Sequence, residues 1–529
     1  MFTAAMMLLS CALLAGAASA SVPVDFSQIG QTFDGVGALS GGGGTSRLLY
    51  DYPEPQRTEV LDALFRPSHG GALQILKVEM GGDGQSTEAT EASHMHTPTD
   101  ENYNRGYEWW LMVEAKKRNP DIKLFTLAWT APGWIGDGSR GPESQGGYYS
   151  EDNIKYHLNW IKGAKETHNL TLDYMGIWNE HSYDVDWIIR LRDAMDGDPY
   201  AKDVQIVASD QGGWPICADM VKNETLLNAV AIIGSHYPVQ GADAKPTPAE
   251  CQTLNTKHGK PLWTSEGWNL GQVNDWKGAM NLALTINQNY VQEEQTAMIV
   301  WTVIYAWYSI FPFAHPDGVT VGGMGHGLMS ATEPWSGHYR IQPTLYTVAH
   351  TSQFTKPGSC KYLKNSAVGV APGGWLDAAN MSSIVVLVCD EGKEWTAVIE
   401  TATAKTLPPT TDFVLSNVPS GAPTKLQVWE TCETSMFQKQ PSVTVATGGK
   451  FSLAIKPQCV TTITTMTTGA AVPSATIPPS AHMSLDYSDS FESYAAETPV
   501  KYFADEGGSF AAEKLNGNGV LAQQVRHTA

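Results

Sequence analysis

The sequence predicts a multidomain protein in which a (β/α)8 (TIM) barrel is followed by a β-sandwich and a short third β segment. Between Phe33 and Ile304, short apolar runs alternate with helix-like stretches, and eight such runs can be counted. This alternation and this number are typical of one parallel barrel. Beyond Ile341 the pattern changes to short alternating strands separated by Gly and Pro turns, which indicates a sandwich. With 529 residues, 42% of them hydrophobic, the chain can form two or three cored domains.

The barrel is expected at residues 34–340. Between two of its strands, Tyr107–Lys117 has the apolar spacing of an amphipathic helix, which ends before Pro120 because proline cannot continue the hydrogen-bond ladder. Active sites of such barrels lie at the C-terminal ends of the strands, so the polar residues there are the candidates for chemistry. The eight strands are predicted at Phe33–Ala38, Leu73–Glu79, Leu124–Trp129, Tyr174–Trp178, Val204–Ser209, Ala231–His236, Leu262–Ser265 and Ala297–Val303.

Three segments follow the barrel. Residues 341–466 are assigned to the sandwich. Residues 467–482 are rich in Thr, Ala, Ser and Pro and are expected to form a linker. Residues 483–529 are too few to form a well-stabilised β domain alone, so they are interpreted as the start of a truncated third domain. Sandwich strands are expected at Ile384–Cys389, Trp395–Thr401 and Lys425–Glu430.

The N-terminus predicts export. Residues 1–20 contain an apolar stretch followed by Ala18-Ser19-Ala20, the pattern of a signal peptide whose cleavage leaves Ser21 first. No later apolar run approaches the roughly 18 residues that a membrane-spanning helix needs. The protein is therefore expected in the secretory pathway, secreted or lysosomal. Glycosylation is expected at the Asn-X-Ser/Thr sites Asn169, Asn223 and Asn380.

Removal of Cys11 with the signal peptide leaves six cysteines. An even number in an exported chain permits disulfides, but the pairing cannot be read from the sequence, and isolated buried thiols are the alternative. No Cys/His spacing suggests zinc, and His94 and His96 lack a third ligand, so no metal is expected. The six cysteines are Cys217, Cys251, Cys360, Cys389, Cys432 and Cys459.

The charge of the chain excludes one class of partner. The net charge is −20, from 54 acidic against 34 basic residues, and no Lys/Arg-rich run is present. A nucleic-acid-binding protein needs a basic surface that releases counterions from phosphates, so no nucleic-acid partner is expected. An acidic surface also suits solubility at moderately low pH, which favours an acidic compartment. The glycine run Gly41–Gly44 does not form the GxGxxG pattern of a nucleotide-binding loop.

Two glutamates follow strands that meet across the barrel mouth. Glu180 ends the fourth predicted strand and Glu266 the seventh. Cleavage of a glycosidic bond needs a proton donor for the leaving oxygen and a second carboxylate that attacks or stabilises the sugar centre, and a retaining pair lies roughly 5 Å apart. Asn179 is placed to contact the sugar 2-hydroxyl. A lone strand-end glutamate is usually a rim residue, but two at these positions predict a retaining β-glycosidase with Glu180 as acid/base and Glu266 as nucleophile.

Several longer strings resemble the galactocerebrosidase family of retaining glycoside hydrolases, and the resemblance covers essentially the whole mature chain. It implies a barrel, a sandwich that includes an N-terminal strand within residues 21–33, and a lectin-like domain that begins in residues 483–529. The strings are Ser40-Gly41-Gly42-Gly43, Thr45-Ser46-Arg47-Leu48-Leu49, Lys77-Val78-Glu79 leading to Gly81-Gly82-Asp83-Gly84-Gln85, Ser93-His94-Met95-His96, Arg105-Gly106-Tyr107-Glu108-Trp109-Trp110-Leu111-Met112 and Glu333-Pro334-Trp335-Ser336-Gly337-His338-Tyr339.

The resemblance also implies a substrate and its contacts. The expected reaction is hydrolysis of galactosylceramide to galactose and ceramide by double displacement, without a cofactor and with a saposin-like sphingolipid activator as partner. Thr87, Trp129 and Asn179 match family residues that contact galactose, and Trp301 is similar to a tryptophan at the floor of the site. The family arginine that reaches the sugar from a sandwich loop has no clear counterpart in Ala402–Pro409, where Lys405 is the candidate substitute although an ammonium lacks the bidentate geometry of a guanidinium.

Two alternatives accompany this reading. One is a retaining hydrolase of the same family that acts on soluble β-galactosides or galactan oligosaccharides. The other is a carbohydrate-binding protein without activity, against which the intact Glu180 and Glu266 speak. For catalysis Glu180 has to be protonated in the first step, so we expect burial and the neighbouring carboxylate to raise its pKa.

Overall fold

A computed structural model describes the chain over most of its length. The expected signal peptide and Asn380 lie outside the described residues. The described residues are 21–135, 147–240, 243–244, 246–267, 275–308, 327–364, 367–368, 382–472, 477–484 and 486–525.

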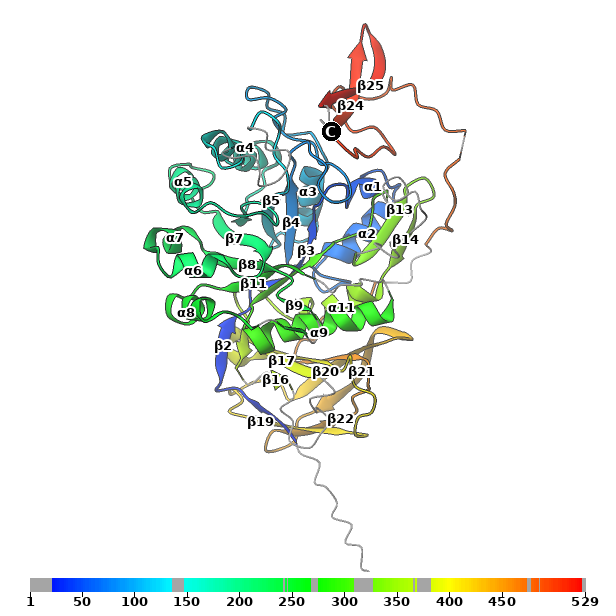
Figure 1. Cartoon of the computed structure of the whole chain (residues 1–529). Coiled ribbons are helices and arrows are strands. Elements are labelled where there is room, and N and C mark those ends of the chain that lie inside the picture. Colours follow the sequence, from blue (N-terminus) through cyan, green and yellow to red (C-terminus); the bar gives the residue numbers. More distant parts are fainter. Residues whose placement is uncertain are drawn as a thin grey trace, which may run out of the picture.

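The predicted barrel is confirmed. Eight parallel strands close in the order β11-β12-β3-β4-β5-β6-β7-β8, so that the first barrel strand, β3, pairs with the last, β12 (Figure 1). Each strand overlaps one of the eight predicted runs, because each run is an apolar segment that becomes buried inside the barrel. The strands are β3 (Gly35–Ser40), β4 (Ile75–Met80), β5 (Lys123–Ala128), β6 (Tyr174–Met175), β7 (Gln205–Gly212), β8 (Ile232–His236), β11 (Leu262–Gly267) and β12 (Ala297–Trp301).

Helices surround the barrel and bury one face each. The helix predicted at Tyr107–Lys117 is α3, Glu108–Arg118, and it ends at Asn119 before Pro120. The longer helices begin at side-chain caps that accept a backbone N–H, as Ser150 does for α4 and Asp275 for α9. The helices are α1 (Arg47–Tyr50), α2 (Gln56–Phe65), α3, α4 (Glu151–His168), α5 (Val185–Asp196), α6 (Ile216–Met220), α7 (Glu224–Ala229), α8 (Ala249–His258), α9 (Trp276–Glu293) and α11 (Pro343–Ser352), with the 3-10 helix η1 (Asp390–Gly392).

A β-rich region lies below the barrel, and α9 and α11 pack between the two (Figure 1). Its larger sheet includes β17 (Ser383–Cys389), β18 (Glu394–Glu400) and β20 (Lys425–Cys432), which overlap the three predicted strands. The remaining strands of that sheet are β2 (Ile29–Thr32), β15 (Lys361–Leu363), β16 (Ala367–Val368), β21 (Ser435–Thr444) and β23 (Val460–Thr464).

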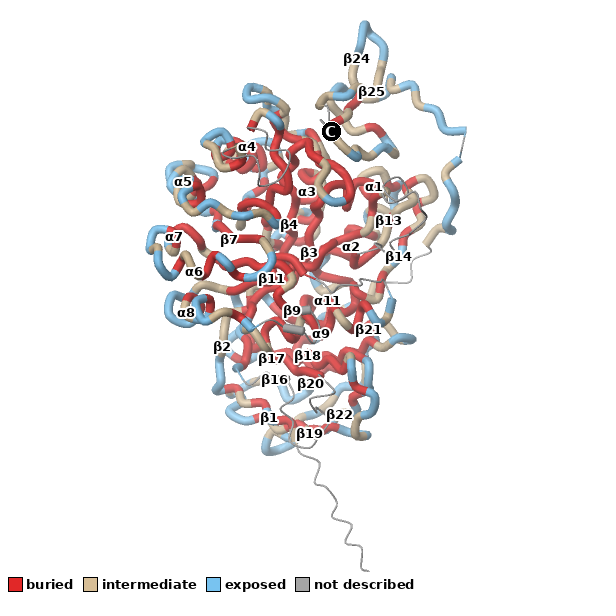
Figure 2. The backbone as a smooth tube through the Cα atoms, viewed as in Figure 1, coloured by how far each residue is buried: buried red, intermediate tan, exposed pale blue. Residues whose placement is uncertain are grey.

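The smaller sheet of this region includes β1, the first strand of the described residues. β1 (Val22–Asp25) pairs in parallel with β19 (Thr411–Ser416), with Val22 opposite Phe413, and β22 (Lys450–Leu453) completes the sheet. The apolar faces of the two sheets form a separate buried cluster that includes Val24, Trp395 and Phe413. Figure 2 shows buried segments in this β-rich region below the barrel. Two short hairpins, β9 (Val239–Gln240) with β10 (Asp243–Ala244) and β13 (Met329–Glu333) with β14 (His338–Ile341), project from the barrel.

The six cysteines form three disulfides, so the alternative of isolated thiols is wrong. The pairs are Cys217–Cys251, Cys360–Cys389 and Cys432–Cys459. The C-terminal segment ends in a two-stranded hairpin, β24 (Ser509–Leu515) with β25 (Asn518–Val525), and the strap before it, residues 497–505, lies along the barrel loops (Figure 1). Among the described residues, no helix combines the length and the apolar character needed to cross a bilayer.

Candidate active site

Glu180 lies just beyond the shortest barrel strand. β6 contains two residues, and the chain after it is held by backbone hydrogen bonds to its neighbours: the Asn179 N–H donates to Ala128 and the Glu180 N–H donates to Asp210, each over 2.9 Å. Glu180 adopts a left-handed φ of 55°. Its side chain is half-exposed, 50% of it open to solvent, so a bound molecule can reach the carboxylate.

Glu266 lies inside the barrel mouth, near the end of β11. The residue is 5% exposed, and its Oε1 accepts a hydrogen bond of 2.9 Å from the hydroxyl of Tyr237. The Tyr237 N–H also donates to the Glu266 carbonyl over 2.8 Å. Tyr237 therefore fixes both the backbone and the carboxylate of this residue.

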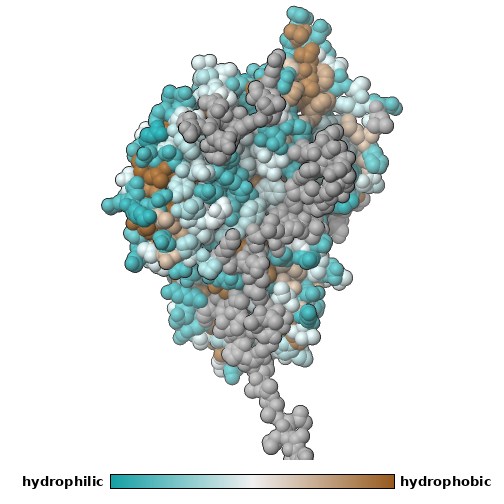
Figure 3. Space-filling view, in the orientation of Figure 1, coloured by the Kyte–Doolittle hydropathy of each residue, from teal (hydrophilic) through white to brown (hydrophobic). Residues whose placement is uncertain are grey.

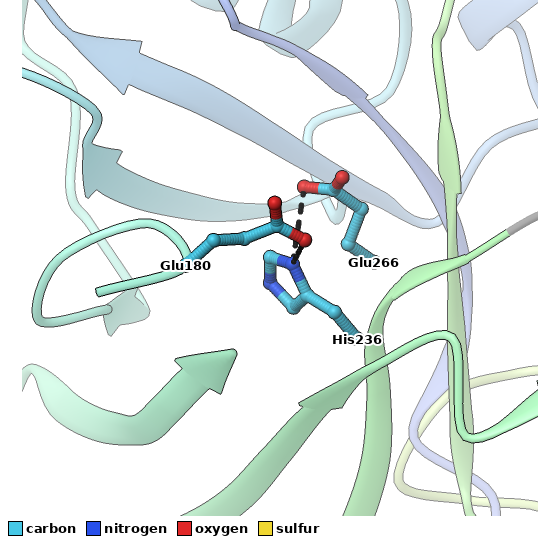
Figure 4. Close-up of side chains that lie close together, drawn as sticks. All are labelled: Glu180, His236 and Glu266. Carbon is cyan, nitrogen blue, oxygen red and sulfur yellow. Dashed lines mark hydrogen bonds and ion pairs between the residues drawn. The ribbon is translucent and has the colours of Figure 1, made fainter. Parts of the chain in front are cut away.

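His236 approaches both glutamates (Figure 4). Its Nδ1 is 3.1 Å from Glu180 Oε1 and 3.7 Å from Glu266 Oε2. One oxygen of each glutamate and one nitrogen of the histidine lie within 4.8 Å of one another. The carboxylates therefore approach as closely as a retaining pair requires and more closely than the roughly 6.5–9.5 Å of an inverting pair.

A buried ion pair lies beside the histidine. Asp210 Oδ1 lies 3.5 Å from His236 Nε2 and 3.2 Å from Lys77 Nζ, and all three side chains are fully buried. Lys77 also donates over 3.0 Å to the carbonyl of Ser265, the residue before Glu266. Lys77, Asp210 and His236 thus link the backbone that carries one glutamate to the carboxylate of the other.

The charges set unequal pKa values for the two glutamates. Glu266, Asp210 and Glu180 together raise the pKa of His236 to about 9, although burial opposes this, so the imidazole is a cation at neutral and acidic pH. Burial raises the pKa of Glu266. The hydrogen bond and the positive charge of His236 lower the pKa of Glu180. The expectation of a raised Glu180 pKa is therefore wrong for the free protein, because it did not take into account a cation beside this carboxylate.

Backbone strain gathers around the same residues. Asp210 and Tyr237 have left-handed φ values of 54° and 49°, like Glu180. Residues other than glycine rarely adopt this conformation, and it is enriched at functional sites where the surroundings enforce it. Three such residues at the ends of neighbouring strands indicate that the site is held in place by its packing.

Three of the residues expected to contact the sugar gather beside the glycine loop Gly41–Gly44. Thr87 is exposed, and its N–H donates to the Gly42 carbonyl over 3.0 Å. A Cβ at Gly42 would lie 3.0 Å from the Thr87 side chain and 3.7 Å from Trp301 Nε1, and a Cβ at Gly41 would lie 2.7 Å from the Trp129 ring. The glycines therefore allow Thr87, Trp129 and Trp301 to border one loop. Their contact with a sugar stays a prediction.

Asn179 is 8% exposed, and its Oδ1 has no hydrogen-bond partner in the described part of the chain. Such a buried amide is available to a ligand hydroxyl. On the sandwich loop, Lys405 is exposed and forms no ion pair with another described residue. No contact supports Lys405 as a replacement for the family arginine.

The remaining predictions concern loops and glycosylation. His96 forms an ion pair with Asp83 over 2.8 Å, and burial lowers the pKa of His94 to about 3, which agrees with structural roles for both. Asn169 is exposed at the end of α4, whereas the Asn223 side chain accepts from the Leu226 N–H as the cap of α7.

The arrangement suits proton transfer and nucleophilic attack. A half-exposed carboxylate faces a buried carboxylate across a distance that a sugar C1 and its leaving oxygen can bridge. Glu180, His236 and Glu266 are also residue types that bind metals, but the raised His236 pKa means that its Nδ1 carries a proton, which a metal would have to displace.

Sequence reasoning missed four residues of this site: Lys77, Asp210, His236 and Tyr237. A signal existed for His236, since it is the last residue of the predicted strand Ala231–His236 and strand ends carry the chemistry in such barrels. Asp210 directly follows another predicted strand. Lys77 had no comparable signal, because it lies within a strand and its partner is 133 positions away.

The comparisons with known proteins agree with this geometry. The family described as Glycosyl hydrolase family 59 matches residues 33–353. A galactocerebrosidase of Canis lupus familiaris is 40% identical over 524 residues, which cover 96% of this chain and 73% of that protein. A galactocerebrosidase of Homo sapiens is 40% identical over 530 residues, which cover 96% of this chain and 71% of that protein.

Solved structures resemble the fold at low sequence identity. The catalytic domain of a GH30 xylanase C from Talaromyces cellulolyticus superposes with a TM-score of 0.61 at 16% identity and covers 84% of this chain and 99% of that chain. A glycoside hydrolase family 30 subfamily 8 xylanase from Clostridium acetobutylicum gives 0.58 at 18% identity, over 84% and 98%. At these identities the likeness concerns the fold alone.

Proposed function

The chain belongs to glycosyl hydrolase family 59, and on this basis we propose that it hydrolyses galactosylceramide to galactose and ceramide with retention of configuration. The observation that carries the proposal is the approach of the Glu180 and Glu266 carboxylates within 4.8 Å at the barrel mouth. That separation is the short one of a retaining pair, in which one carboxylate attacks C1 directly, and not the roughly 6.5–9.5 Å of an inverting pair.

In the first step a carboxylate oxygen of Glu266 bonds to C1 of the galactoside while the bond from C1 to the aglycone oxygen breaks. Glu180 gives its proton to that oxygen, and ceramide leaves. The products are a galactosyl ester of Glu266 and an ionised Glu180. Tyr237 holds the attacking carboxylate through its hydrogen bond to Oε1.

In the second step Glu180 takes a proton from water, and the water oxygen attacks C1. Galactose leaves with its original configuration, Glu266 returns to the carboxylate form, and Glu180 is protonated again. The half-exposed Glu180 becomes buried when a sugar covers it, and this loss of water raises its pKa toward the protonated state that the first step requires. The charge of His236 opposes that rise.

The proposed sugar and the proposed aglycone are supported by different observations. Thr87, Trp129, Asn179 and Trp301 are the proposed galactose contacts, and the identity with galactocerebrosidases supports galactose. Because ceramide is insoluble in water, we propose a saposin-like activator as partner. Soluble β-galactosides or galactan oligosaccharides are the alternative substrates.

The proposed compartment is the lysosome, reached through the secretory pathway. Three disulfides suit an oxidising compartment. The apolar N-terminal stretch and the exposed Asn169 are consistent with the same route. Asn169, Asn223 and Asn380 remain the proposed glycosylation sites.

The test compares two substrates whose leaving groups differ in their need for a proton from the enzyme. Glu180→Gln should lose galactosylceramide hydrolysis but retain attack on 4-nitrophenyl β-galactoside, whose leaving group departs unprotonated, and azide should restore turnover by forming β-galactosyl azide. Glu266→Gln should lose all turnover, and the control Glu433→Gln, at an exposed site on the sandwich, should match the wild type.

Product stereochemistry decides the mechanism. NMR of early product should show β-galactose; α-galactose as the first product would refute retention. Turnover of soluble galactosides alone, with galactosylceramide untouched in the presence of detergent or activator, would select the alternative substrate class. Wild-type turnover by both glutamine variants would refute the proposed roles.

A further inference from the structure

A cavity of about 400 Å³ lies between the barrel loops and the C-terminal segment, and its walls include none of Glu180, His236 and Glu266. One wall comes from α1 and from the loop between β4 and α3. The other wall comes from the strap at residues 497–505 and from the β24/β25 hairpin. Small-molecule sites commonly have volumes of roughly 300–1,000 Å³.

The C-terminal wall of the cavity combines an apolar surface with the carboxylates of Glu497, Asp505 and Glu506. Hydrophobic side chains also gather on the visible face of the hairpin in the space-filling view (Figure 3). Phe503 on this wall is 40% exposed. The apolar wall consists mainly of Pro499, Val500, Phe503, Phe510 and Leu521.

The barrel wall carries polar atoms without partners. Thr90 Oγ1, Glu91 Oε2 and Tyr107 OH are buried and have no hydrogen-bond partner in the described part of the chain. Their residues are only 3%, 2% and 3% exposed. Buried polar groups are nearly always paired, so these three atoms are available to a ligand that enters the cavity.

The charges of the cavity are unbalanced. Its two arginines are already paired, Arg47 with Asp51 and Arg105 with Asp100 and Glu497, and His96 Nδ1 lies 2.8 Å from Asp83. The carboxylates of three further lining residues form no ion pair with any described residue. These residues are Glu91, Asp505 and Glu506, and Glu88 lies near Glu506.

We propose that this cavity binds a primary ammonium group carried on an apolar body, as in an alkylammonium ion. The three N–H groups of an ammonium match the free oxygens of Thr90, Glu91 and Tyr107. Its charge neutralises carboxylates that have no cation, and its apolar body packs against the wall from the strap and hairpin. A neutral alcohol would leave the carboxylates uncompensated, and an organic anion would be repelled.

Binding of such a cation depends on the ionisation of the carboxylates. Burial raises the pKa of Asp505 to about 6 and that of Glu506 to about 7, and it raises the pKa of Glu91 well above its usual range. Arg47 and His96 lower the pKa of Asp505, whereas Asp83 raises it. The alkylammonium stays charged throughout, so its affinity rises with pH as these carboxylates ionise.

The test is a calorimetric titration of the full chain with n-hexylammonium, hexan-1-ol and hexanoate at pH 7.5 and 4.5. We expect 1:1 binding of hexylammonium at pH 7.5, at least tenfold tighter than hexan-1-ol, with weaker binding at pH 4.5 and none of hexanoate. The variant Asp505→Asn/Glu506→Gln should lose at least tenfold in affinity, whereas Glu433→Gln should not change.

Equal affinity for hexylammonium and hexan-1-ol would overturn the proposal, as would undiminished binding by the double variant or no binding at all. Tyr107→Phe provides a second check, since it removes one acceptor and keeps the ring. Circular dichroism and turnover of 4-nitrophenyl β-galactoside show whether each variant is folded, because none of these residues belongs to the proposed catalytic site.

Discussion

Lys77 and Asp210 form an ion pair in which Nζ lies 3.2 Å from Oδ1 and both side chains are fully buried. Lys77 also bonds to the carbonyl before Glu266, and Asp210 approaches the histidine that contacts Glu180. The pair therefore contributes both to the stability of the fold and to the position of the two glutamates. Substitutions can separate these two contributions.

Asp210→Asn should lower the free energy of unfolding by about 3–5 kcal/mol, because Lys77 would keep a buried charge without its partner. Lys77→Met/Asp210→Asn should recover part of that loss, since an apolar side chain replaces the unpaired ammonium. Urea unfolding at pH 7 measures both. A double variant less stable than the single one would contradict this account.

His236→Asn should shift the pH–rate profile. The imidazolium lowers the pKa of Glu180 and opposes the rise at Glu266, so its removal raises both pKa values. Both limbs of kcat/KM against pH should move to higher pH, with activity reduced by at least about tenfold through lost positioning. His258→Asn, an exposed change on α8, is the control. An unmoved profile would show that His236 does not control the glutamates.

Gly43→Ala should disturb the loop beside Thr87. Gly43 has a φ of 68°, and a Cβ there would lie 1.8 Å from the Ala89 carbonyl oxygen. We expect a raised KM for galactosides and a loss of stability beyond the roughly 1–2 kcal/mol of a left-handed alanine. Gly448→Ala is a matched control, because Gly448 has a φ of 83° and open space around its Cβ. Equal changes in KM and stability in Gly43→Ala and Gly448→Ala would exclude a steric clash with Ala89 as the cause.

The free energy of unfolding should fall as the pH rises from 4.5 to 7 or slightly above. Burial raises the pKa of Glu79 to about 7 in the folded chain, against a usual value near 4.5. The folded state binds the proton more tightly, so this contribution is fully present below pH 4.5 and is lost as pH rises through 7; it amounts to about 3 kcal/mol. The free energy of unfolding, measured with urea at several pH values, should fall less steeply with pH in Glu79→Gln than in the wild type. Glu433→Gln should show the wild-type decline.

Cys217→Ala/Cys251→Ala should lower the free energy of unfolding by about 2–4 kcal/mol. This disulfide closes a loop of 34 residues and restricts the unfolded chain. The bond links the α6 and α8 segments, away from the glutamates, so kcat should change little below the melting temperature. A fall in kcat without a fall in stability would assign this disulfide a role in the site.

Local signals explain what could be predicted from the sequence. Each barrel strand is an apolar run of its own, so eight runs sufficed to predict the barrel, and the rule for strand ends then selected Glu180 and Glu266. The pKa of Glu180 could not be predicted in the same way, because its direction depends on His236, a neighbour 56 positions away. The Lys77–Asp210 pair and the disulfide partners likewise exist only through tertiary contacts.

The pairing of β1 with β19 has a consequence for the order of events during synthesis. Val22 lies opposite Phe413, so the first strand of the chain leaves the ribosome 391 residues before its partner. At roughly 5–20 residues per second, this strand waits for about 20–80 s. Throughout that interval the barrel segments emerge while both edges of β1 are open to other chains. The N-terminal strand therefore has to remain without its native neighbour until the whole barrel has been synthesised.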